Sequence, residues 1–330
     1  MHPILFNIPI INRPVHSFGL MLVIGLIGAL QLAKYLAKRH GLNPELFVNA
    51  GLIALATGVL GARFMHVFEN WSAYTRSDLS VFQNLKNMLD VSEGGLTFYG
   101  GLILAFPCCV AYAVWKKVPL RLGMDIVAPC LMIGLGVGRI GCFLNGCCEG
   151  AACELPWAVS YPYASNPYNR EASLGQLTPP PALMTATGPE LYDGQRNEPN
   201  RAFTQSEIDT YTKRSGDATL MELSHQERSG RLHPSQLYST FTALMLAGVC
   251  VAYMTVRHAP GQVMGLMLTL EGASRFVLET LRVEPAVEHV GGVGFSISML
   301  IGLLICGIGI GMWLILGYVE RRQSTRLSLA

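Results

Sequence analysis

Three arginines of this chain lie inside long apolar stretches, where a cation is unfavourable. They are Arg63, Arg139 and Arg275, and Glu271 and Glu279 share the stretch that holds Arg275. An arginine at the centre of a membrane helix costs about 2.5–3.5 kcal/mol on the translocon insertion scale, so such residues face a bundle interior or a wet cavity. The planar guanidinium matches phosphate in a two-pronged geometry. Because the arginines outnumber the well-placed acids, we predict a cavity that binds an anionic headgroup.

A purely structural interpretation of the same residues stays open. Arg275 and Glu279 are four residues apart and are spaced for an ion pair on one helix face. Arg63 can extend its side chain to the membrane surface. Arg282 continues the face that Arg275 and Glu279 define.

Four of the nine cysteines cluster at the end of the fourth apolar stretch: Cys142, Cys147, Cys148 and Cys153. We expect at least one disulfide among them, because the topology deduced below places them on the oxidising side of the membrane. Free buried thiols are the second alternative. A metal site or a nucleophile comes last, because no clear ligand spacing or histidine accompanies the cluster. We therefore expect no metal ion here.

The composition predicts that these residues are carried by membrane helices. The chain has 330 residues, of which 51% are hydrophobic and 14% charged, whereas an average soluble domain has about 25% charged residues. The net charge of +2 gives no reason to expect a nucleic-acid partner. About 20 apolar residues cross a bilayer as a helix. The sequence predicts an all-α membrane protein with about seven such spans, over residues 15–34, 46–68, 95–115, 122–144, 235–256, 262–281 and 293–317.

The positive residues outside the spans predict the orientation. The loops on one side hold more of them than the short loops on the other, and positive charge stays cytoplasmic. The richer side has Lys34, Lys38, Arg39, Lys116, Lys117, Arg121, Arg257, Arg321, Arg322 and Arg326, and the poorer side has Arg13, Arg76, Lys86 and Arg282. We therefore expect the N-terminus outside and the C-terminus in the cytoplasm.

Residues 145–232 form the one long polar segment, rich in Ser, Thr, Gly and Pro. Its composition suits an extracytoplasmic lid or a partly disordered loop. We expect residues 1–330 to form a single polytopic membrane domain that includes this segment.

Several short motifs occur in one order along the chain, and together they resemble the prolipoprotein diacylglyceryl transferases of bacteria. The strongest is GRIGCFLNG at residues 138–146, followed by Gly150. Further matches are EGGLTFYGG at 93–101, RLHPSQLY at 231–238, SRFVLE at 274–279 followed by Arg282, and the weaker FGLM at 18–21, GAR at 61–63 and PWAV at 156–159. The combination is specific, although each short match alone is not.

The resemblance implies a fold and an activity. Members of the family have seven membrane helices with the N-terminus outside, in the bacterial inner membrane. They transfer the diacylglyceryl group of phosphatidylglycerol to the thiol of the lipobox cysteine in a prolipoprotein signal sequence, and they release glycerol phosphate. This is the first step of lipoprotein maturation. It needs no metal or cofactor, and its partners are membrane lipid and the prolipoprotein.

The resemblance also assigns roles to residues. It places catalysis on Arg139, Arg275, Glu279 and Tyr99, with the two arginines stabilising the phosphate leaving group. It places substrate binding on Arg139 together with Arg63, Asn145, Gly150, Gly95, Gly100, His233, Gln236, Tyr238 and Arg282.

The chain departs from the family pattern at several of these positions. Tyr99 replaces the usual histidine, which is the natural base for the acceptor thiol. Cys142 replaces an asparagine and Cys147 a glutamate, while Phe18 and Glu271 each replace a tyrosine. Glu279, Glu149 and His233 are unranked replacements for the base.

Two alternative functions follow from these departures and from the intramembrane charges. One is an inactive or divergent paralogue that binds lipid or another membrane protein. The other is a small transporter, which would be expected to show related halves or broken helices. Neither feature is visible in the sequence.

Overall fold

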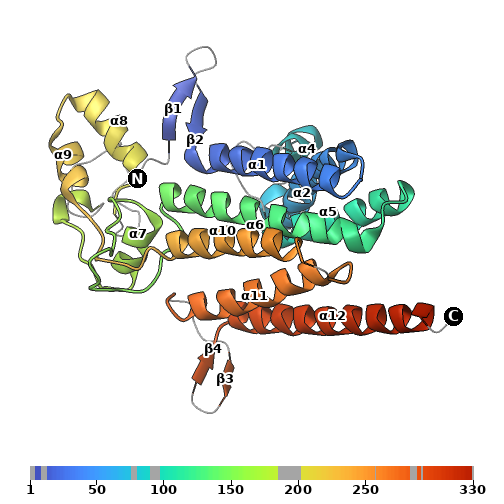
Figure 1. The fold of residues 1–330 in the computed structure, drawn as a ribbon. Helices are drawn as coiled ribbons and strands as arrows, with labels where there is room; N and C mark the ends of the chain where they lie inside the picture. The colour runs from blue at the N-terminus through green and yellow to red at the C-terminus, as the bar shows by residue number, and fades with distance from the viewer. Residues whose placement is uncertain are drawn as a thin grey trace. The chain divides into compact units, whose positions relative to one another are not determined.

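The computed structural model of the chain describes residues 4–8, 13–75, 80–89, 97–184, 202–256, 258–282, 288–290 and 293–328. Helices dominate this part of the chain (Figure 1). Two short antiparallel pairs accompany them, in which β1 (Ile4–Ile8) pairs with β2 (Arg13–His16), and β3 (Glu288–Val290) pairs with β4 (Val293–Phe295).

A helix occupies each of the seven predicted spans. These helices are α1 (Ser17–Arg39), α2 (Pro44–Glu69), α5 (Phe98–Trp115), α6 (Leu120–Asn145), α10 (Ser235–Tyr253), α11 (Gln262–Glu279) and α12 (Ile297–Ser328). The largest boundary errors concern the last span, predicted over 293–317. Strand β4 occupies its predicted start, and the helix continues through the polar residues beyond 317.

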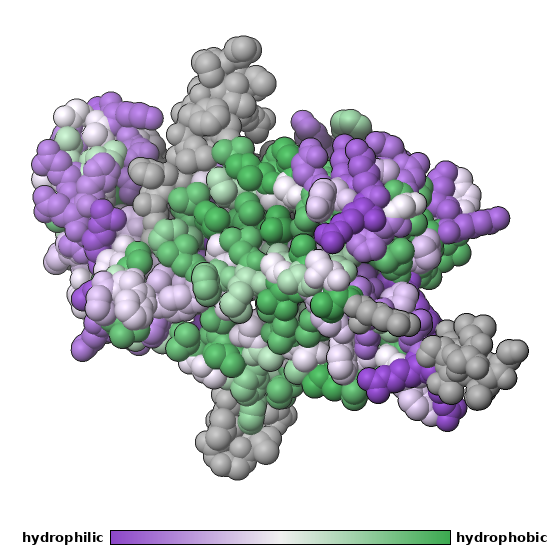
Figure 2. Space-filling model, viewed as in Figure 1, coloured by the Kyte–Doolittle hydropathy of each residue, from purple (hydrophilic) through white to green (hydrophobic). Residues whose placement is uncertain are grey.

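Five of these helices are long and apolar enough to cross a membrane, by length and composition: α1, α2, α6, α10 and α12. The apolar part of α5, Tyr99–Trp115, is shorter. Helix α11 carries Glu271, Arg275 and Glu279, which explains why it is less apolar than its neighbours. Figure 2 shows hydrophobic side chains gathered over the long helices, and hydrophilic ones over the segment that carries α8 (Gln205–Ser215) and α9 (Thr219–Gln226).

The chain divides into two compact units. The first comprises Met1–Gly25, Met132–Gly248 and Leu268–Ile310, and the second comprises Leu26–Leu131, Val249–Met267 and Gly311–Ala330. The boundaries fall inside α1, α6, α10, α11 and α12, while α2 and α5 belong wholly to the second unit.

In the second unit, α2 and α5 pack through glycines. A Cβ atom added to Gly61 would meet the carbonyl oxygen of Gly100 and would lie 2.7 Å from the Cβ atom of Leu104. Small residues allow membrane helices to approach to backbone contact. Gly100, which we predicted to bind substrate, therefore has a packing role in the structure.

We expect Gly61→Ala to destabilise the chain by about 1–3 kcal/mol, the usual cost of overpacking. The added methyl group has no flexible neighbour to displace, because it faces backbone. Gly58→Ala is a matched control on the same helix, since its Cβ atom would lie 4.0 Å from the Cβ atom of Ala105. Thermal unfolding in detergent measures both variants, and equal melting temperatures would contradict the predicted packing.

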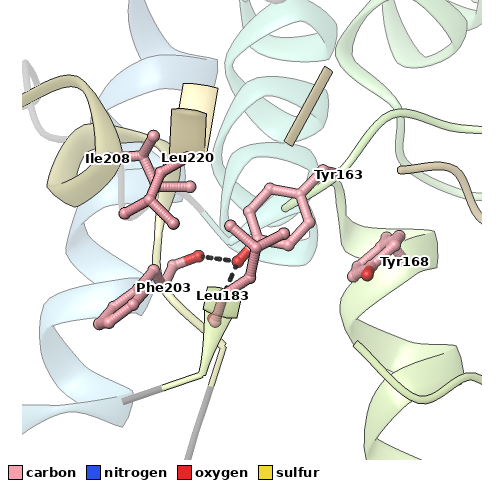
Figure 3. Close-up of a cluster of buried hydrophobic side chains, with 6 residues drawn as sticks. All are labelled: Tyr163, Tyr168, Leu183, Phe203, Ile208 and Leu220. Carbon is pink, nitrogen blue, oxygen red and sulfur yellow. Dashed lines mark hydrogen bonds between the residues drawn. The ribbon is translucent and has the colours of Figure 1, made fainter. Parts of the chain in front are cut away.

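In the first unit, the segment after α6 folds around its own core. It contains α7 (Asn166–Ser173), the 3-10 helix η1 (Pro181–Leu183), α8 and α9. The core side chains, which come from both sides of residues 185–201, are Tyr163, Tyr168, Leu183, Phe203, Ile208 and Leu220 (Figure 3). The hydroxyl of Tyr163 donates to the carbonyl oxygens of Phe203 at 2.6 Å and of Leu183 at 3.5 Å.

Helix α8 shows why a helix begins in this polar segment. The side chain of Thr204 accepts from the backbone of Glu207, and the carboxylate of Glu207 accepts from the backbone of Thr204. This reciprocal capping box satisfies two backbone donors at the helix start. Gly216, with φ of 71°, ends the helix in the left-handed conformation that favours glycine.

Candidate active site

The first unit contains a pocket between α6, α10 and the end of α11. Part of its roughly 430 Å³ of empty space is open to the surroundings. Its lining combines charged and hydroxyl side chains with two leucines: Leu135, Arg139, Ser235, Ser239, Thr242, Glu271, Arg275, Leu278, Glu279 and Arg282.

The pocket brings together the arginines that the sequence singled out. Arg139 comes from α6, whereas Arg275 and Arg282 come from α11 and the turn after it. Of the predicted catalytic residues, Arg139, Arg275 and Glu279 all line the pocket. Helical periodicity accounts for the α11 side of the pocket, because Glu271, Arg275 and Glu279 recur every four residues.

Arg275 has a feature that suggests a ligand. Its Nε atom is buried and has no hydrogen-bond partner among the described residues. A buried donor without an acceptor is unfavourable, by about 1–3 kcal/mol or more for a charged group. Glu279, which is only 5% exposed, pairs with Arg282 through an Nη1–Oε2 distance of 3.4 Å. An anion in the pocket would give the Arg275 donor its acceptor.

Six pocket residues were not among the predicted site residues, and three of them carry hydroxyl groups. Ser235, Ser239 and Thr242 contribute hydroxyl groups from α10. Their signal was present in the sequence, because hydroxyl side chains at i, i+4 and i+7 of an apolar helix share one face. The hydroxyl of Thr240 donates to the carbonyl oxygen of Gly136 at 3.1 Å, which ties α10 to α6 beside the pocket.

Gly150 is the meeting point of three segments, two of which carry pocket residues. Its N–H donates to the carbonyl oxygen of His233 at 2.9 Å, and the N–H of His233 donates to Ala151 at 2.9 Å. The N–H of Ala151 donates to the carbonyl oxygen of Leu281 at 2.8 Å. These bonds join the segment after α6 to the start of α10 and to the turn after α11. Gly150 therefore positions the pocket walls.

The predicted substrate-binding residues at the start of α10 hold the polar segment in place. Gln236 is fully buried, and its Nε2 atom donates to the carbonyl oxygen of Cys147 at 2.6 Å and to the hydroxyl of Tyr161 at 3.0 Å. Burial raises the pKa of Tyr161 to about 12. The hydroxyl of Tyr238 accepts from Nε1 of Trp157 at 2.7 Å and lies 3.3 Å from Nδ1 of His233. None of Gln236, Tyr238 and His233 lines the pocket.

Arg63 belongs to the second unit, where it caps a short helix. Its Nε and Nη2 atoms donate to the carbonyl oxygens of Met88, at 2.8 Å, and Asn87, at 2.7 Å, at the end of α4 (Val81–Leu89). Its guanidinium also lies 5.1 Å from the ring centre of Tyr74, which is in α3 (Trp71–Tyr74). A cation at a helix C-terminus satisfies carbonyl groups that have no partner in the helix. Substrate binding by Arg63 stays a prediction.

Tyr99 and Asn145 are not among the residues that line the pocket. Tyr99, in α5, is 52% exposed, and Asn145 is exposed at the end of α6. Gly95 lies outside the described residues. The catalytic role of Tyr99 and the binding roles of Asn145 and Gly95 stay predictions.

The geometry separates the three alternatives for the missing histidine base. Glu279 lines the pocket. Glu149 is buried and pairs with Arg170, with an Oε1–Nη1 distance of 2.7 Å. His233 contacts Tyr238. Of the three, Glu279 is therefore the only one among the residues that line the pocket.

Three of the four clustered cysteines meet at one point. The sulfur atoms of Cys142, Cys147 and Cys148 all lie within 4.8 Å of one another. Hydrogen bonds from the thiols of Cys142 and Cys147 hold the pKa of Cys148 below its ordinary value, and the charges of Arg139 and Arg282 act in the same direction. All nine cysteines are free in the structure. The predicted disulfide stays a prediction.

Several helices that are long and apolar enough to cross a membrane place the chain in the class of multi-pass membrane proteins. The family model of the prolipoprotein diacylglyceryl transferases matches residues 3–315. The chain therefore belongs to this family of multi-pass membrane transferases, which act in lipoprotein biosynthesis. The family assignment does not favour the paralogue or transporter alternatives.

Individual relatives agree with the family assignment. The chain is 24% identical over 317 residues to a phosphatidylglycerol–prolipoprotein diacylglyceryl transferase of Clostridium tetani, covering 94% of this chain and 96% of the relative. It is 23% identical over 299 residues to the protein of the same name from Corynebacterium diphtheriae, covering 90% and 87%. Identity reaches 33% with the one from Rhodopirellula baltica, over 49% of this chain but only a third of that relative's length.

Proposed function

We propose that this chain transfers the diacylglyceryl group of phosphatidylglycerol to the lipobox cysteine of prolipoproteins and releases glycerol phosphate. The observation that carries the proposal is the convergence of Arg139 and Arg275 on one pocket, where the Nε atom of Arg275 is buried without a partner among the described residues. The names of the relatives support the choice of both substrates.

The reaction needs a group that takes a proton and groups that stabilise a leaving anion. The acceptor sulfur forms a bond to the glyceryl carbon while the bond from that carbon to the phosphate oxygen breaks. The electron pair leaves with this oxygen, so the phosphate gains one negative charge. Arg139 and Arg275 stabilise that charge. Glu279, which lines the same pocket, accepts the thiol proton.

A direct assay tests this function. The purified chain is mixed with phosphatidylglycerol radiolabelled in its acyl chains and with a peptide that contains a lipobox cysteine. We expect label on this peptide and none on a matched peptide with serine at that position, because only a thiol forms the thioether. No label on the cysteine peptide, with a folded chain that still binds phosphatidylglycerol vesicles, would contradict the proposed function.

We further propose seven membrane spans in the bacterial inner membrane, with the N-terminus outside and residues 145–232 forming an extracytoplasmic lid. The helix found in every predicted span supports the count, and the charge asymmetry of the loops supports the orientation. The seven spans and the lid together form a single polytopic domain in this proposal.

Reporter fusions test the orientation. We expect a reporter placed after Arg322 to behave as cytoplasmic and one placed near Gly188 as extracytoplasmic, because positive charge is retained on the cytoplasmic side. Two reporters, each active on only one side of the membrane, serve as mutual controls. The reverse result at both positions would overturn the orientation.

A further inference from the structure

The turn after α6 brings three cysteine side chains to one point. Gly146 and Cys148 both have left-handed backbone conformations, with φ of 67° and 61°. Such a conformation is uncommon for a residue with a Cβ atom. It reverses the chain, and the sulfurs of Cys147 and Cys148 come within 4.8 Å of the sulfur of Cys142 on the last turns of α6.

Hydrogen bonds to other parts of the first unit hold this turn. The hydroxyl of Ser235 donates to the carbonyl oxygen of Cys148 at 2.7 Å, and Nε2 of Gln236 donates to that of Cys147 at 2.6 Å. The N–H of Cys147 also donates to the carbonyl oxygen of Cys142 at 3.1 Å. The backbone that presents the three thiols is thus fixed from outside the cluster.

We propose that Cys142, Cys147 and Cys148 form a binding site for a divalent metal ion of the zinc type, held by three thiolates. Zinc–sulfur bonds of about 2.3 Å in a tetrahedral site place the sulfurs about 3.8 Å apart. Sulfurs that already lie within 4.8 Å of one another need only a small movement to reach this spacing. Each thiol that becomes a ligand releases its proton to solvent.

Two arginines neighbour the cysteine group. Arg139 and Arg282 lie close enough to Cys148 for their charges to act on its sulfur. A divalent ion with three thiolates carries one net negative charge, which these two cations offset. Among the described residues, no fourth histidine, cysteine, aspartate or glutamate joins the group. The fourth position of a tetrahedral ion is therefore left for water or another small ligand.

The convergence of three sulfurs suits a metal site better than a disulfide. A disulfide joins two sulfurs at about 2.05 Å and has no use for a third. Cys153 lies in the same segment but outside the group. The strained turn at Cys148 brings a third sulfur to the group. A three-thiolate site needs this third sulfur, whereas a disulfide does not.

Cobalt titration tests the metal site on the full chain in detergent, without either transferase substrate. After treatment with a chelator and a reductant, we expect one Co²⁺ ion to bind per chain and to give the strong thiolate-to-cobalt absorption of a tetrahedral site. Zinc should then bleach this absorption by displacing cobalt. Because the readout is metal binding, its result is independent of whether the chain transfers diacylglyceryl groups.

Variants decide whether the three cysteines are the ligands. Cys142→Asn introduces the residue usual in the family at this position, so it should fold and yet lose the absorption; Cys148→Ser should lose it too. Cys153→Ser is the matched control and should keep it. The proposal is overturned if Cys142→Asn binds cobalt like the parent, or if the chain isolated without reductant has a disulfide between any two of the three cysteines.

Discussion

Replacing Arg139 with alanine is expected to lower the rate of diacylglyceryl transfer by about 100- to 1000-fold while the chain stays folded. Removing one well-placed donor to a developing anion raises the barrier by about 2.7–4 kcal/mol. Arg139 lines the pocket beside Arg275, and it faces the charge that forms on the leaving phosphate in the proposed reaction. Arg139→Lys should recover only part of the rate, because lysine keeps the charge and loses the two-pronged geometry.

Rate and thermal stability must be measured on the same preparations. A purely structural arginine would behave differently, because its loss leaves a buried partner uncompensated and destabilises the fold by about 3–5 kcal/mol. Arg121→Ala is the matched control, since Arg121 is an exposed residue of the same helix. The phosphate-binding role of Arg139 would have to be abandoned if Arg139→Ala kept near-full activity or melted far below the parent.

Gly150→Ala is expected to destabilise the first unit and to abolish transfer. A Cβ atom at this position would lie 2.6 Å from Cβ of His233 and 2.7 Å from the carbonyl oxygen of Leu281. Overpacking typically costs about 1–3 kcal/mol. Here one of the clashing atoms is backbone, so the three segments that meet at Gly150 must separate. This movement shifts Arg139 relative to Arg282, which lies directly after Leu281.

Gly134→Ala provides the control for this variant. It lies in α6, and a Cβ atom there would meet nothing within 4 Å. Alanine is favoured over glycine inside a helix by about 1 kcal/mol, so this variant should be neutral or slightly more stable. Thermal unfolding and transfer assays on both variants are the measurements. If Gly150→Ala retained the parent's melting temperature and activity, the three-way junction would not be what positions the pocket.

The helices were predictable because each follows from its own stretch of sequence. Long apolar runs identified all seven, and the spacing of Arg275, Glu279 and Arg282 on one face identified one side of the pocket. Costly intramembrane charge then identified Arg139 as part of the same site.

The sequence did not predict which side chains of distant segments contact one another. Gln236 and Tyr238 match the family motif, yet their side chains bind Cys147, Tyr161 and Trp157 rather than the pocket. The side chain of Arg63 and the C-terminal end of α4 are distant in the sequence, and only the fold brings them into contact. Likewise, the spacing in sequence between Cys142 and the pair Cys147 and Cys148 matches no usual ligand spacing. Their sulfurs come together only through a left-handed turn of the backbone.

The core of the polar segment also determines how freely the chain can vary in length. Met184 forms a β-bridge with Ala202, and the N–H of Phe203 donates to the carbonyl oxygen of Leu183 at 2.9 Å. These contacts join the residues on the two sides of the interval 185–201. Since the entropy of closing a loop grows only slowly with its length, each doubling costs about 0.6 kcal/mol. We therefore expect an affinity tag or a small domain that is inserted between these two ends to cost little stability.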